Sequence, residues 1–294
     1  MTNCEHIEQN DSEASVIIDG MRFNSHIYDG GVIRSALQYQ ARPDDIFIVT
    51  PPRSGTTWMQ TIVYALLNQG RAFDEDVDDY ITRNPFLEMH GKEAVEKMPR
   101  PGAIKTHLLF DRIPFHPQAK YICVIRNLKD VCVSLHRFIR TINGGSIDHE
   151  TTFDQFFDGF LSGKIGTVDY FDHLLSYWSH KDDSNVLLVL YEEMKKDIRT
   201  VIHRLGQFLE IDLGEELLER IMNVSSFDYM KKAEFNQKIS RAHTVATFQF
   251  VRKGIVGDWQ TTLTDEQSHR LDERFEEKTR NIPQLSTLWN KYTV

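Results

Sequence analysis

Apolar residues gather in four short runs that have the length and composition of buried β-strands. The runs are rich in Ile, Val and Leu and do not alternate with polar residues. This pattern is typical of parallel strands that are covered on both faces. We expect these strands at Ile46–Thr50, Ala103–Thr106, Tyr121–Arg126 and Val186–Tyr191.

Helical patterns lie between and after these runs, at Trp58–Gln69, Leu128–Arg140, Thr152–Ser162, Tyr170–His180, Ile198–Leu209 and Gly214–Asn223. The pattern becomes irregular after Phe227, until a capping box at Thr264–Gln267 begins a final charged helix that ends at about Arg280. Strands that alternate with helices predict an α/β fold with a central parallel sheet flanked by helices on both faces. A chain of 294 residues fits one domain, which we expect over residues 21–294, after a mobile polar extension over residues 1–20.

Composition narrows the classes of function. The chain has 34 Lys and Arg residues against 43 Asp and Glu residues, a net charge of −9, which argues against general nucleic-acid binding. Its longest apolar runs are far shorter than the ~20 residues of a membrane helix. Cys4, Cys123 and Cys132 have no metal-binding spacing, and an odd number of thiols favours a reducing compartment. The N-terminus is polar and carries no signal-peptide pattern. We therefore expect a cytoplasmic protein without membrane association.

The segment from Thr50 to Trp58 joins a predicted strand to a predicted helix. Such a turn presents free backbone N–H groups, and the helix dipole favours an anion there. Gly55 lets a ligand approach the backbone, Thr56 and Thr57 add hydroxyl groups, and Arg53 adds a positive charge. We interpret residues 50–58, Ser54 included, as a phosphate-binding loop for a nucleotide whose base stacks on Trp58. No Lys follows Gly55, so the Walker A pattern is not met, and a plain strand-to-helix turn is the alternative.

A second basic segment stands near the C-terminus, at Arg252–Trp259. Arg252 and Lys253 precede Gly254, and two adjacent cations beside a flexible residue suit a second phosphate. Together the two segments resemble the cytosolic sulfotransferase family, whose elements read P-K-S-G-T-T-W and R-K-G-x-x-G-D-W. The resemblance extends from about Phe23 to the C-terminus and implies the donor 3′-phosphoadenosine-5′-phosphosulfate (PAPS), with 3′-phosphoadenosine-5′-phosphate (PAP) as product. The lack of a Golgi-type membrane anchor implies small-molecule acceptors.

The resemblance also implies catalytic roles. Sulfonyl transfer needs a base and a cluster of cations or hydrogen-bond donors, and it demands no metal. His107 matches the family's K-T-H segment and is the expected base, because its ordinary pKa of about 6.5 is close to neutral. Lys105 is expected at the transferring sulfonyl, and Ser134 near the moving charge. Arg53 stands where the family has Lys, and arginine cannot donate a proton.

The remaining donor contacts follow by the same resemblance. Arg126 and Ser134 are expected at the 3′-phosphate, where a helix start after the strand offers N–H groups to an anion. Trp58 and Phe227 are expected to hold the adenine between them, with Tyr191 and Ser225 at its polar edge. Without the resemblance, ordinary packing, an ion pair or a helix hydroxyl would account for these residues equally well.

The acceptor pocket is the least defined part. Phe86 and Phe138 match aromatic pocket positions, and residues 142–148 and 231–249 match loops that shape the pocket in the family. An apolar pocket points to a phenol, an alcohol or an aryl amine, and Asp148 and Glu150 would suit a catecholamine. The family's dimer segment is degraded at Gln260, Asp265 and His269, with Thr264 retained, so we expect a monomer or a homodimer. The alternatives are a catalytically weak protein that binds a nucleotide or a hydrophobic ligand, and a P-loop kinase.

Overall fold

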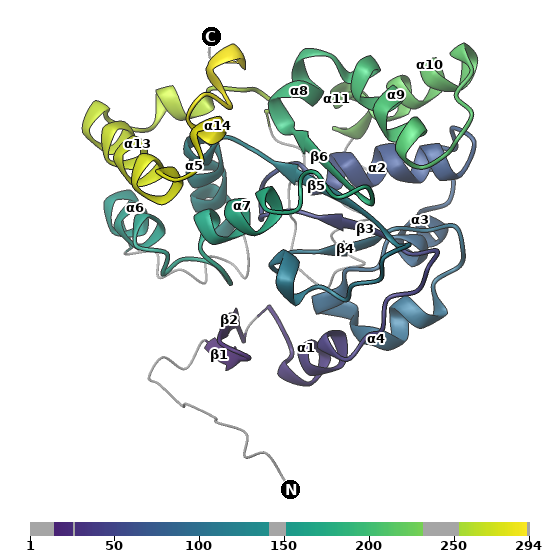
Figure 1. The fold of residues 1–294 in the computed structure, drawn as a ribbon, viewed down its shortest axis with the longest axis horizontal. Coiled ribbons are helices and arrows are strands. Elements are labelled where there is room, and N and C mark those ends of the chain that lie inside the picture. The colour runs from purple at the N-terminus through teal and green to yellow at the C-terminus, as the bar shows by residue number, and fades with distance from the viewer. Residues whose placement is uncertain (1–14, 26, 141–150, 232–252, 293–294) are drawn as a thin grey trace, which may run out of the picture.

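The core of the protein is a parallel sheet of four strands in the order β4-β3-β5-β6 (Figure 1). A computed structural model describes residues 15–25, 27–140, 151–231 and 253–292. The strands are β3 (Ile46–Val49), β4 (Ile104–Thr106), β5 (Lys120–Ile125) and β6 (Val186–Leu190). All four predicted strands and the α/β class are confirmed. Three of the strands end one residue before the predicted position, and β4 ends at the predicted residue.

Residues of each strand point alternately to two helical layers. Phe47 and Val49 belong to one apolar cluster, whereas Ile48 between them belongs to the other. The first cluster includes residues of α1 (Gly30–Leu37), α4 (Leu87–Lys97), α5 (Leu128–Ile139), α6 (Phe153–Leu161), α7 (Tyr170–Trp178) and α13 (Asp265–Thr279). The second includes residues of α2 (Thr56–Leu67), α8 (Tyr191–Lys196), α9 (Ile198–Phe208) and α10 (Glu215–Val224). Both faces of the sheet are therefore covered, which explains why its strands show no polar alternation.

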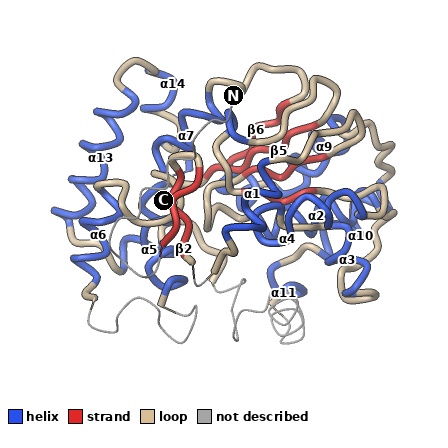
Figure 2. The backbone as a smooth tube through the Cα atoms, turned by 90° about the horizontal axis from the view of Figure 1, so that it is seen from below, coloured by secondary structure: helices blue, strands red, loops and turns tan. Residues whose placement is uncertain are grey.

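The two ends of the molecule consist mainly of helices. In both ribbon views α5, α6 and α13 form one group, and α2, α10 and α3 (Val77–Arg83) lie at the other end (Figures 1 and 2). The predicted capping box is confirmed, because Thr264 accepts a hydrogen bond from the Gln267 N–H and Gln267 accepts one from the Thr264 N–H. The helix it begins is not the last one, as α14 (Pro283–Ser286) follows and buries Leu285. The remaining short elements are α11 (Phe227–Met230) and the 3₁₀ turns η1 (Phe110–Arg112), η3 (Asp258–Thr261) and η4 (Asn290–Tyr292).

The N-terminal part of the chain differs from the prediction. Residues expected in a polar extension instead form β1 (Ser15–Ile18), which pairs antiparallel with β2 (Met21–Asn24). Asp19 and Gly20 connect the strands with positive φ angles of 50° and 77°. An Asp-Gly pair between apolar residues is a strong hairpin signal, so this hairpin was predictable from the sequence. The buried side chain of Ile18 anchors this hairpin to the main core.

The order of the strands in the sheet determines where a ligand-binding crevice forms. The chain leaves β3 for β4 on one side and then returns to β5 on the other side of β3. Such a switch of direction opens a crevice at the carboxyl ends of the strands, where α/β proteins bind their ligands. The loops after β3, β4 and β5 meet there. Within the described segments, no helix is long and apolar enough to cross a membrane.

Candidate active site

The loop after β3 has the geometry expected of a phosphate-binding loop. Gly55 precedes α2 with φ of 98°, and no side chain caps the first N–H groups of that helix. A Cβ atom on Gly55 would lie 2.8 Å from the ring of Tyr191, so glycine is required for space as well as for conformation. The hydroxyl groups of Thr50 and Thr56, 2.6 Å apart, tie the two ends of the loop together. The uncapped helix start therefore faces the pocket as an anion site.

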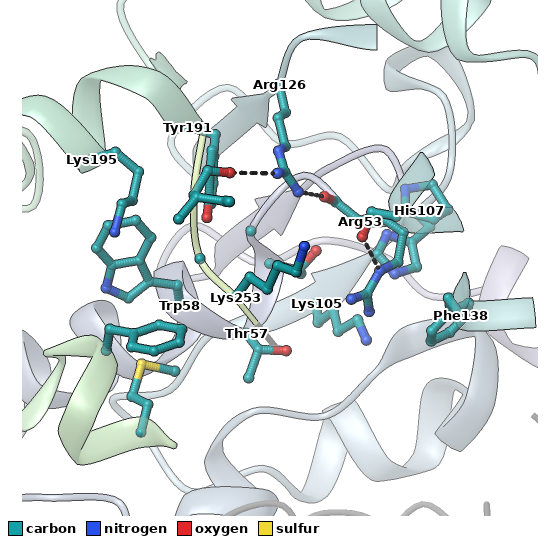
Figure 3. Close-up of a pocket in the computed structure, with 18 residues that line it drawn as sticks. Arg53, Thr57, Trp58, Lys105, His107, Arg126, Phe138, Tyr191, Lys195 and Lys253 are labelled. Carbon is teal, nitrogen blue, oxygen red and sulfur yellow. Dashed lines mark hydrogen bonds between the residues drawn. The ribbon is translucent and has the colours of Figure 1, made fainter. Parts of the chain in front are cut away.

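A single cavity gathers most of the predicted residues (Figure 3). The predicted residues that line it are Arg53, Gly55, Thr56, Thr57, Trp58, Lys105, His107, Arg126, Ser134, Phe138, Tyr191, Phe227, Lys253 and Gly254. Trp58 lies at one end of the cavity, and His107 and Phe138 lie at the other (Figure 3). The same cavity is also lined by Pro52 and Ile255, which belong to the two predicted segments, and by Lys195 and Met230, which were not predicted.

Some predicted residues lie elsewhere. Ser54 is fully buried behind the loop and does not line the cavity. The carbonyl of Ser225 accepts a 2.8 Å hydrogen bond from the Trp58 indole, but its hydroxyl donates to Ile221 within the helix. Phe86 is buried beneath Lys105 rather than exposed to the cavity, because its backbone pairs with β4. Arg252 and both predicted pocket loops, apart from Lys231, lie outside the described residues.

Arg126 links the phosphate loop to the C-terminal basic segment. Its guanidinium donates to the Arg53 carbonyl and to the Ile255 carbonyl, each at 3.2 Å, and lies 4.3 Å from the centre of the Tyr191 ring. Asp130, 3.7 Å from the guanidinium, accepts hydrogen bonds from the backbone of Gly257 and Trp259. Two segments more than a hundred residues apart in sequence are thereby fixed around one cavity.

Ser134 approaches this cluster from α5. It is the seventh residue of the helix that begins at Leu128, so its hydroxyl, and not an N–H group at the helix start, faces the cavity. This corrects the expectation that a helix start captures the anion at this position. The Ser134 hydroxyl accepts a 3.1 Å hydrogen bond from Nε of Arg53, whose guanidinium lies 4.7 Å from the centre of the Phe138 ring.

The other end of the cavity is aromatic and basic. Gly254 adopts φ of 61°, and a Cβ atom there would lie 2.6 Å from the Phe227 ring, so this segment packs directly on the ring. Nζ of Lys195 lies 5.6 Å from the Trp58 ring centre and 5.9 Å from that of Phe227. Two flat faces beside an ammonium group form a slot suited to a heterocyclic base. Nζ of Lys253 is 2.6 Å from Asp258, which holds this cation at the edge of the slot.

His107 presents one ring nitrogen to the cavity. Its Nδ1 lies 2.7 Å from the carbonyl oxygen of Thr50, and because a carbonyl can only accept, Nδ1 carries the hydrogen. The lone pair then resides on Nε2, for which the described residues provide no hydrogen-bond partner. Burial, together with the charge of Lys105, lowers the pKa of His107 well below its ordinary value. The ring is therefore neutral at neutral pH and able to accept a proton.

Lys105 stands two residues before His107 on β4. Its ammonium lies 3.9 Å from the centre of the Phe86 ring, and the side chain is almost fully buried. The pKa of Lys105 is lowered to about 8, mainly by burial; the carboxylate of Glu88 opposes this shift, and the positive charge of Arg53 adds to it. Sequence analysis missed Glu88, which lies below the cavity and accepts a 2.6 Å hydrogen bond from the His107 N–H.

Comparison with known proteins identifies the family. The family model described as "Sulfotransferase domain" matches residues 43–283. The chain belongs to the sulfotransferase family. It is 34% identical over 282 residues to the rabbit (Oryctolagus cuniculus) amine sulfotransferase, covering 92% of each chain. It is 34% identical over 260 residues to human (Homo sapiens) sulfotransferase 1E1, covering 82% of this chain and 85% of the human one.

A solved structure resembles the whole fold of this sulfotransferase. Mouse sulfotransferase SULT7A1, solved in complex with PAP, superposes with a TM-score of 0.78 at 29% identity and covers 95% of this chain and 98% of its own. The chain is thus a sulfonyl-transferring enzyme of the cytosolic type, and the kinase and binding-protein alternatives are set aside. Within the described parts of this sulfotransferase, no group of three or more His, Cys, Asp or Glu residues could hold a metal ion.

Proposed function

We propose that this enzyme transfers a sulfonyl group from PAPS to the hydroxyl or amine of a small aromatic acceptor. The observation that carries the proposal is the arrangement of His107. His107 lines the cavity together with Lys105, Arg53 and the anion-binding loop, and its Nδ1 donates to the Thr50 carbonyl, which leaves the lone pair on Nε2. A base next to two cations at a phosphate site is what sulfonyl transfer requires.

The donor fits this cavity with its base in the aromatic slot. The adenine would stack between Trp58 and Phe227, and the loop from Arg53 to Thr57 would receive the 5′-phosphosulfate at the start of α2. Arg126, Ser134 and the Arg252–Gly254 segment would hold the 3′-phosphate. The mouse structural relative was solved with PAP, the desulfonated form of this donor, which supports the assignment.

The reaction is an in-line displacement. The acceptor oxygen or nitrogen forms a bond to sulfur while its proton moves to Nε2 of His107. The bond from sulfur to the 5′-phosphate oxygen breaks, and PAP leaves with the electron pair. Lys105 and Arg53 stabilise the negative charge that develops on the sulfonyl oxygens and on the leaving phosphate. The protein itself supplies these charges, so the proposed mechanism includes no metal.

The residue at position 53 is expected to affect the rate of sulfonyl transfer, because this enzyme has arginine where the family pattern has lysine. Arginine stabilises the leaving group by charge alone, whereas lysine can also deliver a proton. We expect Arg53→Lys to raise the single-turnover rate of sulfonyl transfer about 100-fold, the lower end of the contribution of a positioned proton donor. Rapid-quench kinetics at saturating PAPS measures this rate. An Arg53→Met variant is the matched control and should be slower than both, and an unchanged rate in Arg53→Lys would count against the role given to Arg53.

An acceptor panel tests the proposed function directly. ³⁵S-labelled PAPS is incubated with the full-length enzyme, without added metal, and with phenols, catecholamines, hydroxysteroids or aryl amines. The amine class is included because the rabbit relative is named an amine sulfotransferase. Labelled product that forms with phenols or catecholamines, and that unlabelled PAP suppresses, supports the proposal. Product with hydroxysteroids alone would contradict the aromatic acceptor, and no product despite PAP binding would contradict the small-molecule acceptor.

The oligomeric state stays a prediction. The positions that match the family's dimer segment, Gln260, Thr264, Asp265 and His269, are all exposed. Three of these four residues depart from the family pattern, which favours a monomer or a homodimer through another surface. Light scattering after gel filtration distinguishes these states. A homodimer that Thr264→Ala, Gln260→Ala and His269→Ala together convert to monomer would assign the interface to this segment after all.

A further inference from the structure

Glu88 is a buried acid placed directly under the catalytic cluster. It lies in the first turn of α4, two residues after Phe86, whose backbone pairs with Lys105 of β4. The side chain is 2% exposed, and Oε1 accepts a 2.6 Å hydrogen bond from the backbone N–H of His107. One carboxylate thus contacts the main chain that carries the proposed base.

The second oxygen of Glu88 is unusual. Oε2 is buried and has no hydrogen-bond partner within the described residues. A buried carboxylate that leaves one oxygen unpaired is costly unless a nearby charge compensates it. The Thr106 hydroxyl and the ammonium of Lys105 both favour the ionised form of Glu88, and Lys105 does so without forming an ion pair with it. Burial raises the pKa of Glu88 to about 7, so the carboxylate is mostly ionised above neutral pH.

We propose that Glu88 is a positioning residue of this site, which fixes the His107 main chain and keeps the buried ammonium of Lys105 charged. The proposal rests on the roles given to Lys105 and His107 under the proposed function. Its chemical basis is simple. An ammonium group that loses water needs a negative partner, and the Phe86 ring beneath it offers only a weak one.

The other groups around this pair cannot replace Glu88. Arg53 adds positive charge that disfavours the ammonium of Lys105. The histidines and tyrosines nearby are neutral, because burial lowers the pKa of the histidines and raises the pKa of the tyrosines. The titratable groups that face Lys105 or Glu88 are Tyr28, Arg53, His90, His107 and Tyr177, with His173 beside His107. None of these groups is a carboxylate, so among the described groups that influence Lys105 the negative charge comes from Glu88.

The proposal predicts how the pH dependence of the enzyme changes in Glu88→Gln. Glutamine keeps the size of the side chain and can still accept the His107 hydrogen bond, but it removes the negative charge. The pKa of Lys105 should then fall, since an opposite charge nearby favours the ammonium form. We expect the alkaline limb of kcat/KM for PAPS, which begins near the Lys105 pKa of about 8, to move down by about one pH unit. The variant should be about fivefold slower than wild type at pH 8 and nearly equal to it at pH 6.

A direct titration of Lys105 provides a readout other than activity. The full-length enzyme is labelled briefly with acetic anhydride from pH 6 to pH 10, and acetylation of Lys105 is quantified by mass spectrometry. The midpoint should move to lower pH in Glu88→Gln. Asp45→Asn is the matched control, because Asp45 is also buried but lies before β3, at the end of the strand opposite the loop, where it binds Tyr39. PAP binding confirms that each variant is folded.

The possible results are distinct. A lower midpoint and a shifted alkaline limb in Glu88→Gln, with neither in Asp45→Asn, support the proposal. A rate that falls equally at every pH, with an unchanged Lys105 midpoint, overturns it and leaves Glu88 a structural residue. If Lys105→Met retains the alkaline limb, the role of Lys105 under the proposed function is wrong. If the labelling midpoint still shifts in Glu88→Gln, the electrostatic contact proposed here stands even so.

Discussion

Replacing His107 by alanine is expected to lower kcat about 10³-fold while PAP binding changes less than about twofold, because a positioned general base contributes about 10²–10⁴ in rate. Alanine removes Nε2, the atom proposed to receive the acceptor proton, and leaves the phosphate loop intact. Radiolabelled turnover measures the first effect, and isothermal titration with PAP measures the second.

Two further measurements sharpen this prediction. His269→Ala, which changes an exposed histidine on α13, should retain full activity. Because burial and Lys105 lower the pKa of His107 well below its ordinary value, His107 stays unprotonated as the pH falls through 6.5, and the rate should hold there. A fall in the rate centred near pH 6.5 that is absent in His107→Ala would contradict this prediction. It would mean that the His107 ring is more exposed to water than in the structure.

Replacing Arg126 by methionine is expected to weaken PAP binding about 100-fold or more. The change removes the proposed charge-assisted contact to the 3′-phosphate, and truncating one partner of a buried charged pair costs about 2–5 kcal/mol. It also frees the Arg53 and Ile255 carbonyls, to which the guanidinium donates at 3.2 Å. Isothermal titration with PAP gives the dissociation constant, and thermal unfolding monitors the fold.

The choice of controls separates charge from geometry. Arg126→Lys retains the positive charge, but a single ammonium cannot reach both carbonyls in the same way. We therefore expect it to recover only part of the affinity. Arg199→Met removes a surface arginine of α9 that pairs with Glu215 of α10. This variant should bind PAP with the affinity of the wild type. Full recovery in Arg126→Lys would show that the bridging hydrogen bonds contribute nothing to binding.

The central sheet was predictable because its strands are buried on both faces and read as continuous apolar runs. Helices with a clear apolar stripe, such as α5 and α9, were predictable because their apolar residues recur with the helical period. Others were not. Helix α3 buries only Tyr80 among its seven residues, and α4 contains a glycine at φ of 72° that breaks its periodicity. Short polar segments of this kind owe their helical form to tertiary packing, which a local pattern does not contain.

Much of the cavity lining was predictable because residues 53–58 and 253–254 belong to two contiguous segments with specific spacing. Glu88 and Lys195 were not, since each gains its position from a contact with residues distant in sequence. Glu88 meets the backbone of His107, and Lys195 meets the rings of Trp58 and Phe227. Phe86 was expected in the acceptor pocket for the same reason. The sequence alone does not show whether its ring lines the pocket or packs beneath Lys105.

The two aromatic side chains expected in the acceptor pocket each support a cation of the reaction. Phe86 lies against the ammonium of Lys105, and Phe138 against the guanidinium of Arg53. A change of Phe138, which lines the cavity, would therefore alter its shape and the surroundings of Arg53 together, whereas a change of Phe86 would act through Lys105. Evolution of new acceptor preferences at these positions would be coupled to turnover, so laboratory selection for a new acceptor should yield variants that trade speed for selectivity until a compensating change arises near the cations.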